Sequence, residues 1–186
     1  MALKARQRTG FSRRASRYLD PKGNSMVYKA FIRPCLEYAH LTWMGAAPSH
    51  LEHLDAVQRA AAHLIGEDGP ELDSLDHRRR VGALTYLYKL RCWTPPARLQ
   101  NLVPPPLPQP PIGRTRASTL AHATWHADQF QNILPLRSLD NARRAFPYGV
   151  IADWNSLPVS FFDDGYHFDY LQRFKERAHH HLKGQQ

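Results

Sequence analysis

Cysteine is scarce in this chain of 186 residues, and no long apolar run is present. Cys35 and Cys92 are the only cysteines, and they form no C-x-x-C pair. Two separated cysteines are too few for a disulfide framework and do not fit a zinc ribbon. The first 20 residues lack the apolar core of a signal peptide, and no segment approaches the ~20 apolar residues of a membrane span. We therefore expect an intracellular protein without membrane contact, and the pattern leaves nucleus and cytoplasm equally open.

Several motifs that carry chemistry are also absent. The chain has no G-x-S-x-G, G-x-G-x-x-G or G-x-x-x-x-G-K-[ST] sequence. Those patterns expose a nucleophile or cradle phosphates, so the corresponding hydrolase and nucleotide-binding classes are disfavoured. Among the eleven histidines, His122 and His126 have i, i+4 spacing near Asp128, but no H-E-x-x-H occurs. Solvated or half-buried histidines are the favoured interpretation, and we expect no metal site, no cofactor and no catalytic residue.

Positive charge is the main compositional feature. The formal net charge is +9, and the sequence pI is about 9.9. Lysine and arginine that meet phosphates release condensed counterions, so the charge predicts attraction to polyanions. The first acidic residue is Asp20, and six cations precede it. These six are Lys4, Arg6, Arg8, Arg13, Arg14 and Arg17. We favour phosphate contact over a merely solvated surface for this cluster.

Helices are expected from the start of the chain. Two are predicted in the basic segment, at 2–8 and 12–18, because Gly10 favours a break between them. Asp20 and Pro21 combine an N-cap acceptor with proline at the first helical position. This pair predicts a further helix, on which apolar residues recur at helical spacing.

Residues that typically start or end helices mark helix boundaries over the next seventy residues. Pro34 lacks an N–H and is expected to bend or end its helix near Arg33. The segment Ser49–Glu52 fits a capping box and predicts the start of a helix that stops at Gly66. The apolar spacing over 77–92 predicts another helix.

Proline separates the two halves of the chain. The segment VPPPLPQPP, at 103–111, predicts an extended, polyproline-like spacer. Beyond it, an amphipathic helix is predicted at 166–182. The expected fold is mainly α: a small helical bundle, a proline-rich linker and a C-terminal helical segment. The predicted boundaries are 1–102 for the first region, 103–140 for the irregular linker and 141–186 for the extension.

An ordered series of short motifs runs through nearly the whole chain. It comprises Y-K-x-x-I-R-P-x-L-E-Y followed by a tryptophan, then L-x-x-V-Q-R-x-A, R-T-R, W-N-x-L-P and F-K. The matching residues are Tyr28, Lys29, Ile32, Arg33, Pro34, Leu36, Glu37, Tyr38, Trp43, Leu54, Val57, Gln58, Arg59, Ala61, Arg114, Thr115, Arg116, Trp154, Asn155, Leu157, Pro158, Phe174 and Lys175. In this order they resemble the region after the palm in non-LTR (LINE-type, jockey-like) retrotransposon reverse transcriptases.

The resemblance implies a thumb-like helical region that grips nucleic acid beside a polymerase palm. The palm and its metal-binding carboxylates precede this region in the family, so the resemblance implies a chain without polymerase activity. The expected partners are RNA or RNA–DNA hybrid, bound weakly and electrostatically, and the palm or fingers of a parent polymerase. Added to the N-terminal cluster, the candidate phosphate-binding residues are Arg33, Arg59, Arg114 and Arg116. Arg59 has a structural alternative, an ion pair with an acid such as Glu37 or Asp55.

One string invites an enzymatic hypothesis. Phe161–Asp164 reads F-F-D-D, which matches the F-x-D-D of a reverse-transcriptase metal-binding turn. That chemistry needs two strands flanking the turn and a third carboxylate. Here Gly165 and a helical pattern follow, so we interpret the string as an acidic loop that favours the start of the next helix.

Two non-enzymatic hypotheses remain. In the first, the chain is a nonspecific nucleic-acid binder. In the second, it is a structural packing module or an inert transposon remnant. Trp43, Trp93 and Trp154 are expected in cores or interfaces and not as base-stacking platforms.

Overall fold

The computed structural model describes residues 2–93, 103–109, 125, 127–131 and 140–184. The chain forms two compact units, Met1–Arg79 and Arg80–Gln186. Over the described ranges the fold is mainly helical, as predicted, and the one element of β structure is an isolated bridge. In the same ranges, no helix is both long enough and apolar enough to cross a membrane.

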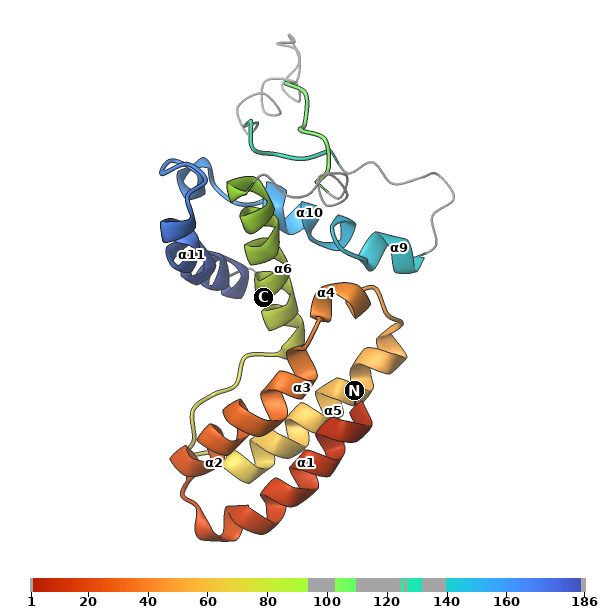
Figure 1. The fold of residues 1–186 in the computed structure, drawn as a ribbon, viewed down its shortest axis with the longest axis vertical. Helices are drawn as coiled ribbons and strands as arrows, with labels where there is room; N and C mark the ends of the chain where they lie inside the picture. The colour runs from red at the N-terminus through yellow and green to blue at the C-terminus, as the bar shows by residue number, and fades with distance from the viewer. Residues whose placement is uncertain (1, 94–102, 110–124, 126, 132–139, 185–186) are drawn as a thin grey trace. The chain divides into compact units, whose positions relative to one another are not determined.

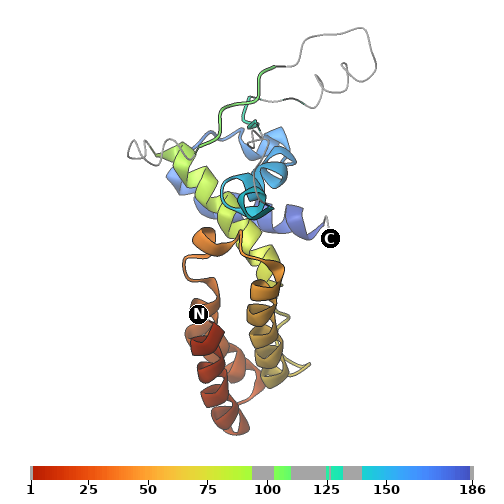
Figure 2. The same cartoon turned by 90° about the vertical axis from the view of Figure 1, so that its right-hand side faces the viewer.

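The first unit is a bundle of helices. Its elements in chain order are α1 (Ala2–Ala15), η1 (Ser16–Tyr18), α2 (Pro21–Val27), the π-helical η2 (Tyr28–Ile32), α3 (Arg33–Glu37), α4 (His40–Trp43) and α5 (Pro48–Ile65). Figures 1 and 2 show α1, α5 and the rod formed by α2, η2 and α3 side by side. The core between them contains Ala5, Tyr28, Ile32, Leu36, Leu54, Val57, Ala61, Ile65 and Leu75.

The basic N-terminal segment is a single helix, and the predicted break at Gly10 is wrong. α1 runs without interruption from Ala2 to Ala15. It packs along α5, with Ala5 and Ser12 buried seven residues apart on its inner side. Glycine inside a helix costs only ~0.5–1 kcal/mol relative to alanine, so packing on either side of Gly10 outweighs that preference.

Pro34 neither ends its helix nor leaves it regular. The helical rod continues to Glu37, and its π-helical turn lies directly before the proline. The Arg33 N–H donates to the Tyr28 carbonyl, five residues back. This wider turn accommodates a residue that has no N–H and whose ring would crowd the preceding turn. The predicted disturbance is therefore present, but the helix ends four residues later than Arg33.

Three further predictions concern helix ends, and the structure confirms two of them. The Asp20 carboxylate accepts from the Gly23 N–H at 2.7 Å, which confirms the predicted N-cap. Gly66, with φ of 81°, follows the last residue of α5 and confirms the predicted stop. The capping box is wrong, because α5 begins at Pro48 after Ala47 and no side chain caps it. Proline at the first helical position needs no cap for its own missing N–H.

Helix α6 (Leu75–Cys92) includes the predicted 77–92 segment. Its first turn belongs to the first unit and the rest to the second. The second unit also contains α9 (Asp140–Arg144), α10 (Tyr148–Asn155), η3 (Val159–Phe161), η4 (Phe168–Tyr170) and α11 (Leu171–Lys183). The first compact unit thus ends at Arg79, within α6, whereas the predicted first region extended to residue 102.

Trp154 is the centre of the second unit's core and is fully buried, as expected. Its ring lies 5.2 Å from Phe162, 5.5 Å from Phe130 and 5.9 Å from Phe174, centroid to centroid. Its indole N–H donates to the Asp128 carbonyl at 2.8 Å. A large apolar ring with its one polar atom satisfied is a stable core residue.

The W-N pair has a joint structural role. Next to Trp154, the Asn155 side chain accepts from the Phe130 N–H and donates to the Phe130 carbonyl, both at 2.9 Å. A side-chain amide can satisfy both backbone groups of one residue because it carries a donor and an acceptor. The two adjacent residues therefore anchor the 128–130 segment to α10.

The described part of the proline-rich segment is extended, and it is paired. The Leu107 N–H donates to the Gln129 carbonyl at 2.8 Å, and the Gln131 N–H donates to the Pro105 carbonyl at 2.9 Å. The Trp125 indole N–H donates to the Leu107 carbonyl at 3.1 Å. Residues 103–109 are thus held within the second unit and do not form a free spacer.

Candidate nucleic-acid interface

The six N-terminal cations lie on α1 and η1, and they surround the helix. Ala5 and Ser12 face inward, and successive residues turn by about 100°. Arg6 and Arg13 therefore lie on one flank of α1, whereas Lys4 and Arg8 lie on the other. Arg14 and Arg17 are exposed away from the core. The sequence cluster is consequently divided in space, and no single ligand surface contains all six cations.

A groove runs between α1 and α5 on the first flank. Its lining residues are Arg6, Thr9, Gly10, Arg13, Ala56, Val57 and Ala60. The volume is about 300 Å³. Arg6 and Arg13 are two turns apart, ~10 Å along the axis. Between them Gly10 has no side chain, and a Cβ added there would meet nothing within 4 Å.

The lining of this groove contains two arginines and no acidic side chain among the described residues. Among the described residues, neither Arg6 nor Arg13 forms an ion pair with an acidic side chain. The α5 side of the groove consists of the small apolar residues Ala56, Val57 and Ala60. Two unpaired guanidinium groups over a small-residue floor suit the phosphates of an extended polyanion.

The opposite flank of α1 has a different character. Arg8 donates to the Phe31 carbonyl at 2.7 Å, and its guanidinium lies 5.6 Å from the centroid of that ring. A second groove there is lined by Lys4, Arg8, Pro34, Cys35 and Tyr38. Arg8 is thus partly committed to α1–η2 packing, while Lys4 remains exposed.

Two of the arginines predicted from the family motifs are held by acids. Arg33 pairs with Glu37 at 2.9 Å, and Arg59 pairs with Glu52 at 2.5 Å. The Glu52 hydrogen bond raises the pKa of Arg59 above its ordinary value. The structural alternative for Arg59 is correct in kind, but the partner is Glu52 and not Glu37 or Asp55. Both arginines are weaker phosphate-binding candidates than Arg6 and Arg13, because their charge is already compensated.

The run of three arginines, Arg78 to Arg80, is also engaged within the protein. Arg78 pairs with Glu37 at 3.1 Å, Arg79 with Asp76 at 3.5 Å, and Arg80 with Asp153 at 2.5 Å. Each of the three side chains therefore has an acidic partner, and this run is not a free cationic surface. Arg114 and Arg116 lie outside the described residues.

The groove residues Thr9, Gly10, Ala56 and Ala60 were not predicted. The small side chains at 56 and 60 are one helical turn apart on α5, which is the only signal that the sequence carried. That spacing does not identify a groove unless α1 continues through Gly10. A continuous α1 is what aligns Arg6 with Arg13.

The F-F-D-D string forms a turn after η3, with no strand on either side among the described residues. Phe162 is buried against Trp154, and Asp164 pairs with Arg173 of α11 at 3.0 Å. Phe161 is the last residue of η3, and the rest of the string leads towards η4, without the hairpin geometry of a polymerase metal site.

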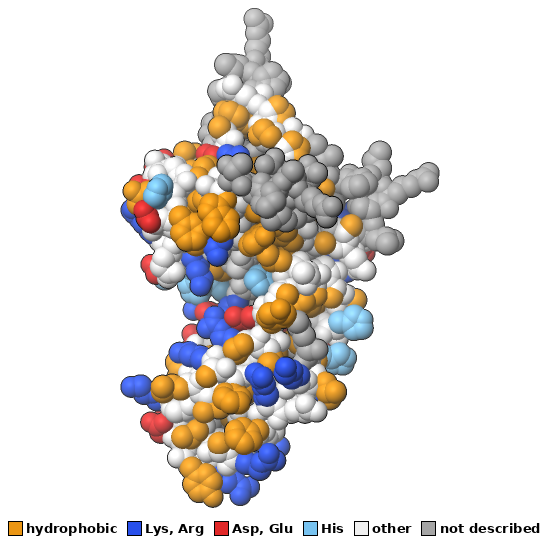
Figure 3. All heavy atoms as spheres, viewed as in Figure 1, with side chains coloured by type: hydrophobic (Ala, Val, Ile, Leu, Met, Phe, Trp, Pro, Cys, Tyr) orange, Lys and Arg blue, Asp and Glu red, His pale blue; other side chains and the backbone are white. Residues whose placement is uncertain are grey.

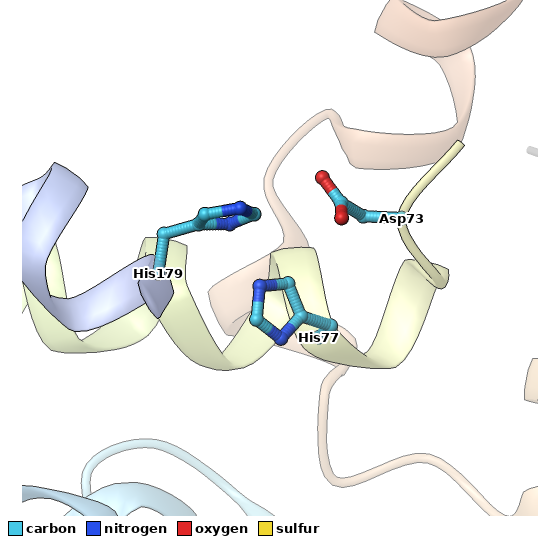
Figure 4. Close-up of side chains that lie close together, drawn as sticks. All are labelled: Asp73, His77 and His179. Carbon is cyan, nitrogen blue, oxygen red and sulfur yellow. The ribbon is translucent and has the colours of Figure 1, made fainter. Parts of the chain in front are cut away.

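Three potential metal ligands are drawn in Figure 4. Asp73 and His77 belong to the first unit, and His179 lies on α11 of the second. We assign no metal site to residues that are divided between the two units. His122 and His126, the pair considered from their spacing, lie outside the described residues.

Figure 3 shows the basic side chains over α1 to α3 interspersed with apolar ones, with few acidic side chains among them. Comparisons with protein-family models, curated proteins and solved structures returned no match for this chain. The class that fold and site define is accordingly a basic, mainly α protein of two compact units with a cationic groove on the first.

Proposed function

We propose that the chain is a non-catalytic C-terminal region, thumb and post-thumb, of a non-LTR-type reverse transcriptase, and that its first unit binds RNA or RNA–DNA hybrid without sequence preference. The ordered motif series supports the family. The mainly helical bundle agrees with a thumb-like region. The groove between α1 and α5 supports the binding role, and Arg6 and Arg13 are its principal phosphate contacts.

One observation carries the binding proposal: Arg6 and Arg13 are aligned across an open Gly10, with no acidic side chain on α1. Such an arrangement contacts phosphates and does not read bases, since arginine at the backbone positions a ligand without reporting its sequence. Each phosphate contact contributes ~0.7–0.9 to the slope of log affinity against log salt. A protein using a few such contacts binds weakly at physiological salt and more tightly at low salt.

The test is binding of the full chain to a fluorescently labelled RNA–DNA hybrid at several salt concentrations. Gly10→Glu places a carboxylate between the two arginines, and Gly10→Ala is its matched control. Both replacements favour helix over glycine, so the fold is preserved. We expect Gly10→Glu to weaken binding at least tenfold at low salt, and Gly10→Ala to leave it within twofold of the parent chain. Equal binding by the two variants would contradict the proposal.

A second variant tests the charge itself. Arg6→Gln combined with Arg13→Gln removes two contacts, so the salt slope is expected to fall by ~1.4–1.8. Arg59→Gln, which removes a cation already paired with Glu52, is the control and should leave the slope unchanged. If the affinity of the parent chain does not change with salt concentration, the electrostatic mechanism is excluded.

A packing module is the second candidate, and one observation favours it. The first unit exposes large apolar side chains, namely Leu3, Phe11, Tyr18, Leu19, Met26, Phe31 and Tyr38. Contiguous exposed apolar surface commonly marks an interface. Strong binding of a hydrophobic dye and concentration-dependent association, together with absent hybrid binding, would support this candidate over nucleic-acid binding.

A further inference from the structure

A pair of stacked aromatic rings lies on the flank of α1 opposite the cationic groove. Phe11 of α1 and Phe31 of η2 have centroids 6.4 Å apart and planes inclined by 22°. The two residues keep 54% and 50% of their surface exposed. Core phenylalanines are buried, so a half-exposed stacked pair leaves ring surface available to a ligand.

Cations flank both rings. The Arg8 guanidinium is 5.6 Å from the Phe31 centroid, and the Arg14 guanidinium is 5.8 Å from the Phe11 centroid. Neither arginine, nor nearby Lys4, forms an ion pair with an acid in the part of the chain that the structure describes. The rings are therefore surrounded by uncompensated positive charge.

An apolar groove continues from this pair. It is lined by Lys4, Arg8, Pro34, Cys35 and Tyr38 and has a volume of about 340 Å³. Arg8 belongs to both features, because it lines the groove and lies over Phe31. Tyr38, 71% exposed, adds a third accessible ring. Apolar walls with cationic side chains at the edge accommodate a planar, uncharged ring attached to an anionic backbone.

We propose that this face, formed by Phe11, Phe31, Tyr38, Lys4, Arg8 and Arg14, binds single-stranded nucleic acid by stacking its bases. Aromatic platforms combined with a cationic backbone track are the common design for sequence-tolerant single-strand binding. A duplex keeps its bases stacked inside and offers none to Phe11 or Phe31. A purely apolar protein partner leaves the positive charge of Lys4, Arg8 and Arg14 without a counterpart, and the single strand accounts for both features. The inference rests on the proposed function and adds a second, single-strand face to it.

The experiment compares two probes of equal phosphate number, a single-stranded RNA containing 2-aminopurine and an RNA–DNA hybrid. Phe11→Leu combined with Phe31→Leu keeps apolar volume but removes both π-faces, and the Gly10→Glu chain is measured in parallel. We expect the double leucine variant to lose at least tenfold in single-strand affinity, since both base-stacking surfaces are removed. Its hybrid affinity should stay within twofold. The 2-aminopurine emission quenched by the parent chain should recover in the variant.

The outcomes separate this inference from the proposed function. Unchanged single-strand affinity in the leucine variant, with normal hybrid binding, would overturn the inference alone. If the parent chain binds neither probe, both this inference and the proposed function are overturned. If the leucine substitutions abolish self-association of the chain but not single-strand binding, the face is a protein contact and the inference is wrong. Phe11→Tyr combined with Phe31→Tyr retains both π-faces and should keep single-strand affinity within twofold of the parent chain; a loss equal to that of the leucine variant would also count against stacking.

Discussion

Arg78, in the first turn of α6, donates a hydrogen bond of 2.8 Å to the hydroxyl of Tyr28 in η2, fifty residues earlier. The same guanidinium bonds the Gln58 side-chain oxygen and pairs with Glu37 at 3.1 Å. Tyr28 in turn donates to Gln58 at 3.0 Å. This polar network joins the start of α6 to the π-helical turn and to α5, within the first unit.

Removing the cation of this network is expected to destabilise the first unit. Arg78→Met leaves the buried oxygens of Tyr28 and Gln58 with fewer donors, at a cost of roughly 3 kcal/mol. Hydrogen–deuterium exchange at residues 28–37 and 54–65 measures the loss locally. The control, Arg59→Met, breaks an exposed pair and should leave exchange unchanged, because exposed pairs contribute little. Similar exchange in the two variants would show that the network is not stabilising.

Tyr28 also predicts the response of the first unit to alkaline pH. Burial raises the pKa of Tyr28 above its ordinary value of 10.0, although Arg78 opposes the shift. Above pH 10 the unfolded chain releases this proton while the folded chain retains it. The stability that the Tyr28 hydroxyl contributes is therefore fully present below pH 10 and is lost as pH rises further. Tyr28→Phe should lower stability at pH 8 but reduce its decline between pH 8 and 11. A parent-like slope in Tyr28→Phe, from urea unfolding followed by circular dichroism, would refute this assignment.

In the second unit, the amide of Asn155 is the sensitive group. Asn155→Asp keeps the acceptor for the Phe130 N–H but replaces the donor to the Phe130 carbonyl with a charged oxygen. We expect a loss of ~1–3 kcal/mol. Thermal unfolding by circular dichroism checks it, with Asn141→Asp as control, because Asn141 is exposed and its side-chain oxygen, which accepts from Arg144, is retained in aspartate. A larger effect at Asn141 than at Asn155 would contradict the anchoring role.

Gly10 should be a site where stability can be gained. It lies within α1, and an added Cβ meets no atom within 4 Å. Gly10→Ala is therefore expected to stabilise the first unit by ~0.5–1 kcal/mol. Gly149 is the contrasting site, since a Cβ there would lie 2.4 Å from the Arg144 carbonyl oxygen. Gly149→Ala should destabilise the second unit, and urea midpoints for the two variants should move in opposite directions.

Capping residues, helix-ending glycines and apolar spacing predicted helices correctly where the stabilising interaction lies within a few residues along the chain. The Asp20 cap depends on a side chain that bonds its own turn, and the Gly66 stop depends on the left-handed backbone that glycine allows. The helix over 77–92 follows from apolar spacing along the chain. The errors occurred where packing opposes a preference. Gly10 is helical because both halves of α1 pack on the core, and Pro34 is accommodated by a π-helical turn instead of a chain break.

The candidate sites depended even more on tertiary structure. The sequence identified six cations before Asp20, but their division between two flanks of α1 follows from which residues the core buries. Arg33 and Arg59 pair with acids on their own helices, Glu37 and Glu52. The partner of Arg78 is also Glu37, which only folding brings near it. Phe11 and Phe31 are twenty residues apart and become a stacked pair only when α1 packs beside η2.

Composition and periodicity alone determined that this protein is basic and mainly helical, because charge and helical spacing are properties of the chain itself. Only the tertiary structure decided which cations remain available, that Asn155 and Trp154 anchor a distant segment, and that Gly10 opens a groove between Arg6 and Arg13. The physical reason is that a side chain's partners are chosen by packing between helices, which depends on residues far apart in sequence.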